Sequence, residues 1–112
     1  MAYDEGLAHR LDELFEGRSD VQLRKMFGGL CYMVRDHMCC GIVGDRLMAR
    51  VGPERYDECL SHAHAREMDF TGKALKGMIY VLPGGIESDE DLNFWVGQCE
   101  RFVASLPPRK PK

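Results

Sequence analysis

Five cysteines and four histidines are the residues of this chain with the clearest capacity for chemistry. Thiolates and imidazoles bind transition metals, and a thiolate beside a base is a nucleophile. Cys39 and Cys40 are adjacent, and His37 stands two positions before Cys39. Because neighbouring side chains of a strand point to opposite faces, we expect Cys39 and Cys40 to serve different sites. His37 and Cys39 would share a face, but zinc takes three or four ligands, so the sequence favours buried, inert thiols here.

The remaining candidate sites have structural explanations of their own. His62 and His64 could bind a divalent ion from one side of an extended segment, but no third ligand is close in sequence, which favours surface histidines at a helix exit. Cys59 is the least implausible reactive thiol, although nothing in the sequence pairs it with a base. The acidic residues within 87–91 coincide with a predicted helix start, where the dipole stabilises negative charge. We therefore expect no catalytic residue, no cofactor and no metal site.

A weak basic pattern is the only indication of nucleic-acid binding. The net charge of -3 argues against a general electrostatic attraction to nucleic acid, and acidic residues are interleaved with the basic ones. Solvated strand ends explain the same residues equally well. The candidate strip consists of Arg24, Lys25, Arg35, Arg46 and Arg50.

Three short apolar runs organise the chain, at 30–34, 38–43 and 47–51, with turn residues between them. This pattern is typical of an antiparallel β-meander. Gly28-Gly29, just before the first run, predicts a bulge or a sharp change of direction. In the first two runs both odd and even positions are apolar, so we expect both faces of these strands to be covered, by helices, by a second chain, or by one of each.

Capping residues and helical periodicity place the flanking helices. Asp4 caps a predicted first helix, Pro53 opens a short second one, and Ser88 caps a long last helix that ends at Pro107-Pro108. Apolar residues recur at helical spacing throughout the last helix, which makes it amphipathic. The buried stripe of the first helix is predicted to be Leu7, Leu11, Leu14 and Phe15.

Methionines are concentrated in or beside the predicted strands, and methionine suits adaptable contact surfaces. Together with the two-sided apolar strands, they predict that part of one sheet face contacts another protein, most simply a second copy of the chain. The alternative is that the last helix covers that face within one chain. The predicted contact residues are Tyr32, Met33, Met38 and Met48.

Length and composition bound the class of protein. The 112 residues predict a single domain over 1–106, followed by a basic, proline-rich disordered tail over 107–112. No run approaches the length of a membrane span, and the N-terminus is too polar for a signal peptide. An odd number of cysteines without an export signal is typical of free thiols in the cytoplasm.

Several ordered motifs resemble the TfoX N-terminal domain family. They are Met26-Phe27-Gly28-Gly29 before the meander, Met68-Asp69-Phe70-Thr71-Gly72-Lys73, Gly77-Met78-Ile79-Tyr80-Val81, and the closing Ser105-Leu106-Pro107-Pro108. The resemblance implies an α+β fold of the YgaC/TfoX-N, secretion-chaperone-like type, in which an antiparallel β-meander sheet is flanked by N- and C-terminal helices. It carries no catalytic residues over to this chain.

Longer members of that family, the TfoX/Sxy proteins, regulate natural competence together with the cyclic-AMP receptor protein and carry a second, C-terminal domain. The resemblance therefore implies a small non-enzymatic regulatory or protein-interaction domain, associated only indirectly with the transcription machinery. The alternatives are a nucleic-acid-associated factor that uses the basic strip, and a thiol enzyme or small-ligand binder that uses Cys59 or the two histidines His62 and His64.

Overall fold

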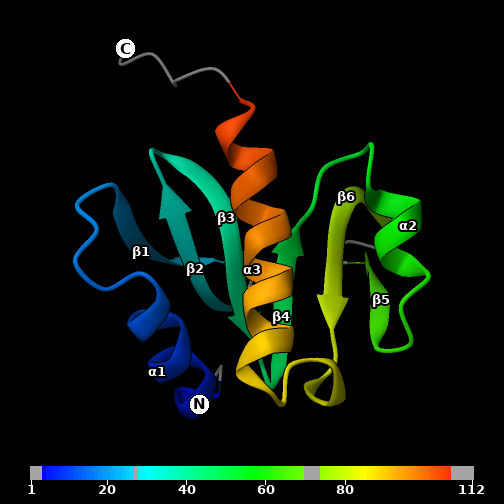
Figure 1. Ribbon diagram of the computed structural model, residues 1–112, viewed down its shortest axis with the longest axis horizontal. Coiled ribbons are helices and arrows are strands. Elements are labelled where there is room, and N and C mark those ends of the chain that lie inside the picture. Colours follow the sequence, from blue (N-terminus) through cyan, green and yellow to red (C-terminus); the bar gives the residue numbers. More distant parts are fainter. Residues whose placement is uncertain (1–3, 27, 70–73, 107–112) are drawn as a thin grey trace.

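The computed structural model describes residues 4–26, 28–69 and 74–106, which form a six-stranded antiparallel sheet with helices packed against it (Figure 1). The strand order is β1-β2-β3-β4-β6-β5, so β1 and β5 are the two edges. The predicted α+β class, a meander flanked by N- and C-terminal helices, is confirmed. The strands are β1 (Val21–Met26), β2 (Gly29–Val34), β3 (His37–Val43), β4 (Arg46–Arg50), β5 (Ala65–Asp69) and β6 (Ala74–Val81). The helices are α1 (Glu5–Leu14), α2 (Tyr56–Leu60), the short 3₁₀ helix η1 (Pro83–Gly85) and α3 (Asp89–Ala104).

Gly28-Gly29 turns the chain sharply from β1 into β2, as predicted. Met26 pairs directly with Gly29, and Gly28 has a φ of 76°. A Cβ on residue 29 would lie 1.9 Å from the carbonyl oxygen of Ile42, so only glycine lets β3 approach this closely. Phe27 itself lies outside the described residues, as do residues 70–73 and the predicted tail over 107–112.

A β-bulge interrupts the pairing of β2 with β3. Tyr32 pairs with Cys40 whereas Met33 pairs with Met38, so Cys39 has no partner across the ladder. A bulge of this kind adds one residue to one strand and breaks the strict alternation of faces. Its consequence for the two neighbouring cysteines is described below.

The N-terminal helix α1 is capped as predicted but buries a narrower stripe. The Asp4 carboxylate accepts hydrogen bonds from the backbone N–H groups of Gly6 (2.8 Å) and Leu7 (3.2 Å). Leu11 is completely buried, whereas Leu14 is 36% exposed. The inclusion of Leu14 in the buried stripe was therefore wrong. The buried arc is centred between Leu11 and Phe15, and Leu14 falls at its margin.

The C-terminal helix α3 runs across β3 and β4 (Figure 1) and confirms the strongest pattern in the sequence. Ser88 Oγ accepts a hydrogen bond from the backbone N–H of Asp91 at 3.0 Å, which caps its first turn. Of the described helices, none is long and apolar enough to span a membrane. The residues that α3 buries are Leu92, Trp95, Val96, Cys99 and Val103.

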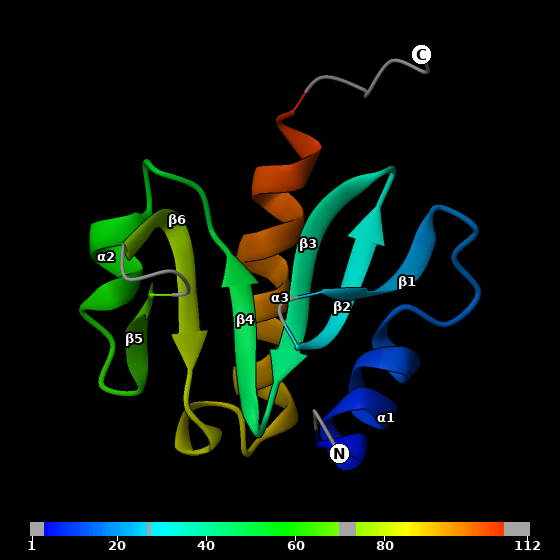
Figure 2. The same cartoon turned by 180° about the vertical axis from the view of Figure 1, so that it is seen from behind.

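The sheet separates two clusters of buried side chains. The larger one, here called the helix-side core, joins α1, α2 and α3 to one face of the strands. In the smaller one, here called the methionine cluster, every member is a strand residue; seen from behind, β3 and β4 lie in front of α3 (Figure 2). Every residue of β2 is buried, which confirms that both faces of the central strands are covered. The methionine cluster comprises Cys31, Met33, Met48, Met68 and Tyr80, with Met38, Val43 and Met78 partly buried around it.

Candidate functional site

The edge strand β1 is the most open part of the sheet. It pairs with β2 over six consecutive residues without a bulge, and along its other side it pairs with no further strand of the described residues. Residues 22–25 are exposed. Leu23 is 51% exposed, the highest value for a large apolar side chain in the described part of the chain. Such an edge presents unpaired backbone N–H and C=O groups to any chain that approaches it.

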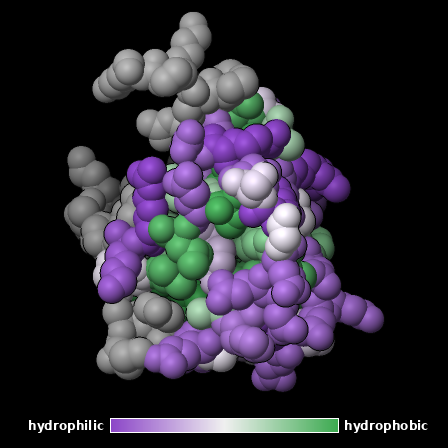
Figure 3. Space-filling model, turned by 90° about the vertical axis from the view of Figure 1, so that its left-hand side faces the viewer, coloured by the Kyte–Doolittle hydropathy of each residue, from purple (hydrophilic) through white to green (hydrophobic). Residues whose placement is uncertain are grey.

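Helix α1 supports this edge. Leu23 pairs across the ladder with Tyr32, whose hydroxyl donates to the carbonyl oxygen of Ala8 (3.0 Å) and contacts Asp12 Oδ1 (2.7 Å). The Phe15 ring stacks on the Tyr32 ring with 5.4 Å between centroids. On the side of the molecule that α1 and β1 occupy, apolar surface gathers among hydrophilic side chains (Figure 3). Leu14 and Leu23 are the exposed large apolar residues of these two elements.

The opposite edge, β5, is shorter and less regular. It is five residues long, and its pairing with β6 shifts register between Glu67 and Asp69. Like β1, it carries two adjacent charged side chains, at 66 and 67. Short length and a bulge are among the usual protections of an edge strand against pairing with another chain. Of the two edges, β1 is therefore the one suited to accept a strand.

The predicted contact residues do not form one surface. Tyr32 belongs to the helix-side core beneath α1 and is 1% exposed, so the folded chain cannot offer it to a partner. Met33 and Met48 lie on the other face, but both are buried in the methionine cluster. Met38 is half-buried at the border of that cluster. The prediction of a shared contact surface was wrong because the strands that are apolar on both sides bury both of these sides within one chain.

The predicted basic strip is also divided. Arg24 and Lys25 are exposed on β1, and Arg35 is exposed in the β2–β3 turn, where its φ is 50°. The Arg46 guanidinium lies 4.1 Å from the centroid of the Tyr80 ring in the methionine cluster. The Arg50 guanidinium instead lies 5.2 Å from the Phe102 ring of α3 and donates to the carbonyl oxygen of Met38 at 3.2 Å.

Cys39 and Cys40 lie in the same core, contrary to the prediction from strand alternation. The β3 bulge turns both side chains into the helix-side core, where Cys39 is hydrogen-bonded to Cys40 and to Cys99 of α3. These two hydrogen bonds lower the pKa of the Cys39 thiol. The pKa of Cys40 is raised by its hydrogen bond with Cys39, and the pKa of Cys99 is raised by burial. All three thiols are at most 1% exposed, which keeps external reagents away from them.

Cys31 and Cys59 are buried as well, whereas His62 and His64 are exposed at the surface. Burial raises the pKa of Cys31 to about 11, and burial likewise raises that of Cys59. The His62 ring contacts the Trp95 ring edge-on at 5.0 Å, while His64 packs beside Gly84. Within the described residues, no group of three or more His, Cys, Asp or Glu side chains is arranged to hold a metal ion.

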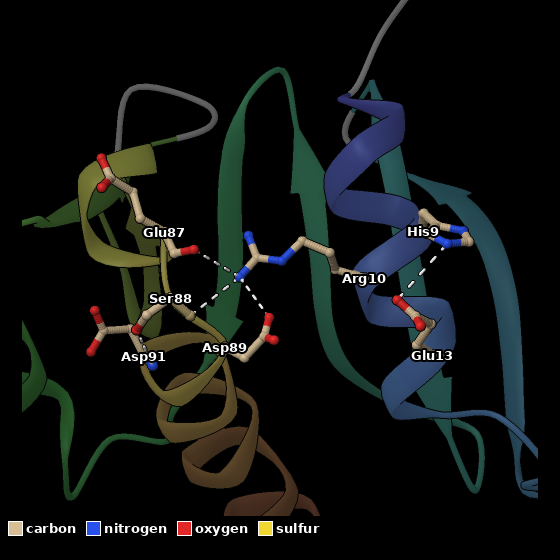
Figure 4. A network of polar contacts seen from close by, with 7 residues as sticks. All are labelled: His9, Arg10, Glu13, Glu87, Ser88, Asp89 and Asp91. Carbon is tan, nitrogen blue, oxygen red and sulfur yellow. Dashed lines mark hydrogen bonds and ion pairs between the residues drawn. The ribbon is translucent and has the colours of Figure 1, made fainter.

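A polar network joins α1 to the start of α3 (Figure 4). Arg10 donates to the carbonyl oxygens of Glu87 (3.4 Å) and Ser88 (3.2 Å) and pairs with the Asp89 carboxylate at 3.4 Å. The carboxylate of Asp91 points away from Arg10 (Figure 4). No local pattern in the sequence indicated this contact, because its partners lie about eighty positions apart. The network fixes both helices against the same end of the sheet.

Comparison with known proteins assigns this arrangement to a family. The family model of the TfoX N-terminal domain matches residues 13–103. The chain belongs to the TfoX N-terminal domain family. The predicted resemblance is thereby confirmed, and the match runs from the last two residues of α1 to the last turn of α3, so that it includes the whole sheet. No curated protein and no solved structure gives a significant match to the chain.

Two features of this TfoX N-terminal domain were missed from the sequence. Leu23 was absent from the candidate sites, because the sequence does not disclose which strand forms an edge. Gln98 and Arg101 were absent from the candidate sites, yet they line a groove between α3 and the β4–α2 loop that is described below. Both residues lie on the polar side of a helix that was interpreted from its apolar stripe alone.

Proposed function

We propose that this domain is a non-catalytic regulatory module that binds a partner protein through the open edge of β1. The observation that carries the proposal is the regular, unbulged β1 edge with Leu23 exposed at its centre. An extended segment of a partner can add to such an edge, with backbone hydrogen bonds supplying affinity and side chains supplying selectivity. The regulatory part of the proposal rests on membership of the TfoX N-terminal domain family.

The charges on β1 indicate which partner suits it. Arg24 and Lys25 are both exposed on the strand, flanking Leu23 on one side. In a pair of antiparallel β1 strands from two copies, these cations would lie close to their counterparts and repel one another. A strand that offers an apolar residue beside acidic ones is complementary. We therefore favour a partner with such a segment over a second copy of this chain.

Amide hydrogen exchange with defined peptides tests the edge. An acetylated peptide of alternating glutamate and valine should protect the amides of β1, and a lysine–valine peptide of the same length should protect them less. Protection of β5 instead, or of no strand at any peptide concentration, would contradict the proposal. Sedimentation of the chain alone tests the second copy: a dimer that dissociates in the Leu23→Lys variant would place a second copy at the β1 edge.

Paired surface variants distinguish specific binding at the β1 edge from non-specific binding to exposed apolar side chains. Leu23→Gln should weaken binding of the acidic peptide at least fivefold, because it removes the exposed apolar contact without changing the charge of the strand. Phe94→Gln is the matched control, since Phe94 is 42% exposed on α3 and outside the β1 edge. Equal loss in both variants would count against a site at β1.

Nucleic-acid binding is the competing outcome of these experiments. If basic side chains held labelled DNA, affinity would fall steeply with salt concentration and charge reversal at Arg46 and Arg50 would weaken it. We expect no such behaviour, because both guanidinium groups already lie over aromatic rings, that of Arg46 over Tyr80 and that of Arg50 over Phe102. Salt-sensitive binding that requires both arginines would replace the protein-partner proposal.

A further inference from the structure

A groove of about 340 Å³ lies between the C-terminal half of α3 and the loop that joins β4 to α2. Its helical wall consists of residues at positions 98, 101, 102 and 105, which follow one face of α3. Its other wall is the backbone and side chains of residues 51–55. The volume falls within the range of small-molecule sites in proteins.

The loop wall is held rigidly in place. The backbone N–H groups of Val51 and Gly52 both donate to the carbonyl oxygen of Gly77, at 2.9 and 3.0 Å. Gly52 has a φ of 89°, and a Cβ at this position would lie 2.4 Å from the Phe102 ring. Glycine therefore lets the ring pack directly on the loop backbone. The groove is formed before any ligand binds.

A buried acceptor beside the groove has no donor. Gln98 lines the groove, and its Oε1 atom is buried without a hydrogen-bond partner in the part of the chain that the structure describes. Buried polar side-chain atoms in folded proteins are nearly always hydrogen-bonded, and an unsatisfied one calls for an explanation. A rotation of the Gln98 amide toward the groove would let a ligand hydroxyl or N–H group satisfy it.

The charged groups of the groove favour an anion. Arg101 on the helical wall forms no ion pair within the described residues, and Arg55 on the loop wall makes only a long, exposed pair with Glu58 at 3.7 Å. Glu54 also lines the groove and is exposed, so it repels an anion that lies near it. An anionic group between the two guanidinium groups and away from Glu54 gains the most. Val51, Pro53 and Phe102 supply apolar contacts.

We propose that this groove binds a small aromatic acid: a planar apolar body that carries a carboxylate or phosphate group and, apart from it, one hydrogen-bond donor. The anion pairs with Arg101 and Arg55, the donor satisfies Gln98 Oε1, and the ring packs against Phe102. The site is separate from the β1 edge, so this proposal does not depend on a protein partner.

Matched probe compounds test each part of the proposal. We expect 4-hydroxybenzoate to shift the backbone amide resonances of residues 51–55 and 98–105 with a Kd on the order of 1 mM, as befits a ligand of this size. Benzoate lacks the donor and phenol lacks the anion, so each should bind at least fivefold more weakly. Comparison with 4-hydroxyphenyl phosphate decides which anion the site prefers. Equal binding of all four compounds, or shifts outside the groove, would overturn the proposal.

Variants assign the contacts to residues. Arg101→Gln alters an exposed side chain and should weaken 4-hydroxybenzoate at least fivefold while leaving phenol unchanged. Gln98→Leu should abolish the preference for 4-hydroxybenzoate over benzoate. Arg24→Gln on β1 is the control for a lost positive charge and should change nothing. If Arg101→Gln binds 4-hydroxybenzoate as tightly as the unaltered chain, the proposal is wrong whether or not Gln98→Leu folds.

Discussion

The two faces of the sheet are buried by different means. Three helices and a set of branched and aromatic side chains cover one face, whereas the buried cluster on the other face consists, among the described residues, of strand side chains, most of them methionines. Leu47 and Met48 are neighbours on β4, and both are completely buried, one on each face. These two adjacent residues therefore allow the helix-side core and the methionine cluster to be compared at equal burial.

The difference shows how each face tolerates change. Branched side chains packed between a sheet and helices occupy defined rotamers, so loss of volume there leaves a cavity. Methionine has three rotatable bonds and a polarisable sulfur atom, so its neighbours can shift to fill a gap. We expect the helix-side core to depend on shape and the methionine cluster to depend mainly on apolarity.

The largest expected effect separates these two environments directly. Leu47→Ala should lower the free energy of unfolding by about 3 to 5 kcal/mol, because the helices around it cannot close the cavity. Met48→Ala should cost less, about 2 to 3 kcal/mol, since the surrounding methionines relax into the space. Urea denaturation of both variants measures the difference. Equal costs would show that the two faces are equally rigid.

A smaller effect concerns the hydrogen bonds that hold α1 to the sheet. Tyr32→Phe should cost about 1 to 2 kcal/mol, because the hydroxyl's contacts with the Ala8 carbonyl oxygen and the Asp12 carboxylate are lost. Tyr56→Phe is the matched control. The Tyr56 hydroxyl makes no hydrogen bond of normal geometry among the described residues and has only the Glu67 carboxylate as a nearby acceptor, so its removal should cost less than about 1 kcal/mol. Thermal unfolding in which Tyr56→Phe is the more damaging change would contradict this assignment.

A conservative change in the methionine cluster should have a smaller effect still. Met48→Leu keeps the volume and the apolar character, so we expect a cost below about 1 kcal/mol. The measurement is again the urea midpoint, with Met33→Leu as a second example on the same face. A cost that approaches that of Leu47→Ala would mean that this face, too, requires a particular shape.

The smallest expected effect is a pH dependence at the surface. Arg18 contacts both Asp20 and Glu100, and its hydrogen bond holds the pKa of Asp20 below its usual value. Because the folded-state pKa is lowered, the stabilisation is complete above a pH of about 4 and is lost as the pH falls through the folded-state pKa. The stability difference between the unaltered chain and Arg18→Gln should therefore be constant from about pH 5 to 7 and shrink in acid. A difference that grows in acid would be inconsistent with this pair.

Local patterns predicted much of the fold. The Asp4 and Ser88 caps, the meander and the apolar stripe of α3 are confirmed, since each depends on spacing within one element. The exposure of Leu14 was missed because an amphipathic pattern does not specify how much of the helix its neighbours cover. The shared core of Cys39 and Cys40 was missed because a bulge arises from the register between two strands rather than from either strand alone.

The candidate sites were harder to predict than the fold. The prediction of a basic strip treated five basic residues as one free surface, but the guanidinium groups of Arg46 and Arg50 lie over the rings of Tyr80 and Phe102. The prediction of a contact surface assumed that apolar strand residues on the face without helices are accessible, whereas Met33 and Met48 are buried. The β1 edge and the α3 groove both depend on which segments become neighbours in space.

The contacts of Arg10 with the start of α3 determine which substitutions in this region preserve the link between the two helices. Arg10 holds the entrance of the helix mainly through main-chain oxygens, those of Glu87 and Ser88. Every amino acid has the same main-chain carbonyl oxygen, so a substitution at position 87 leaves the hydrogen bond from Arg10 in place. A substitution of Arg10 itself removes the hydrogen bonds to both oxygens. Of the residues joined by these contacts, Arg10 is therefore the one whose substitution removes all of them.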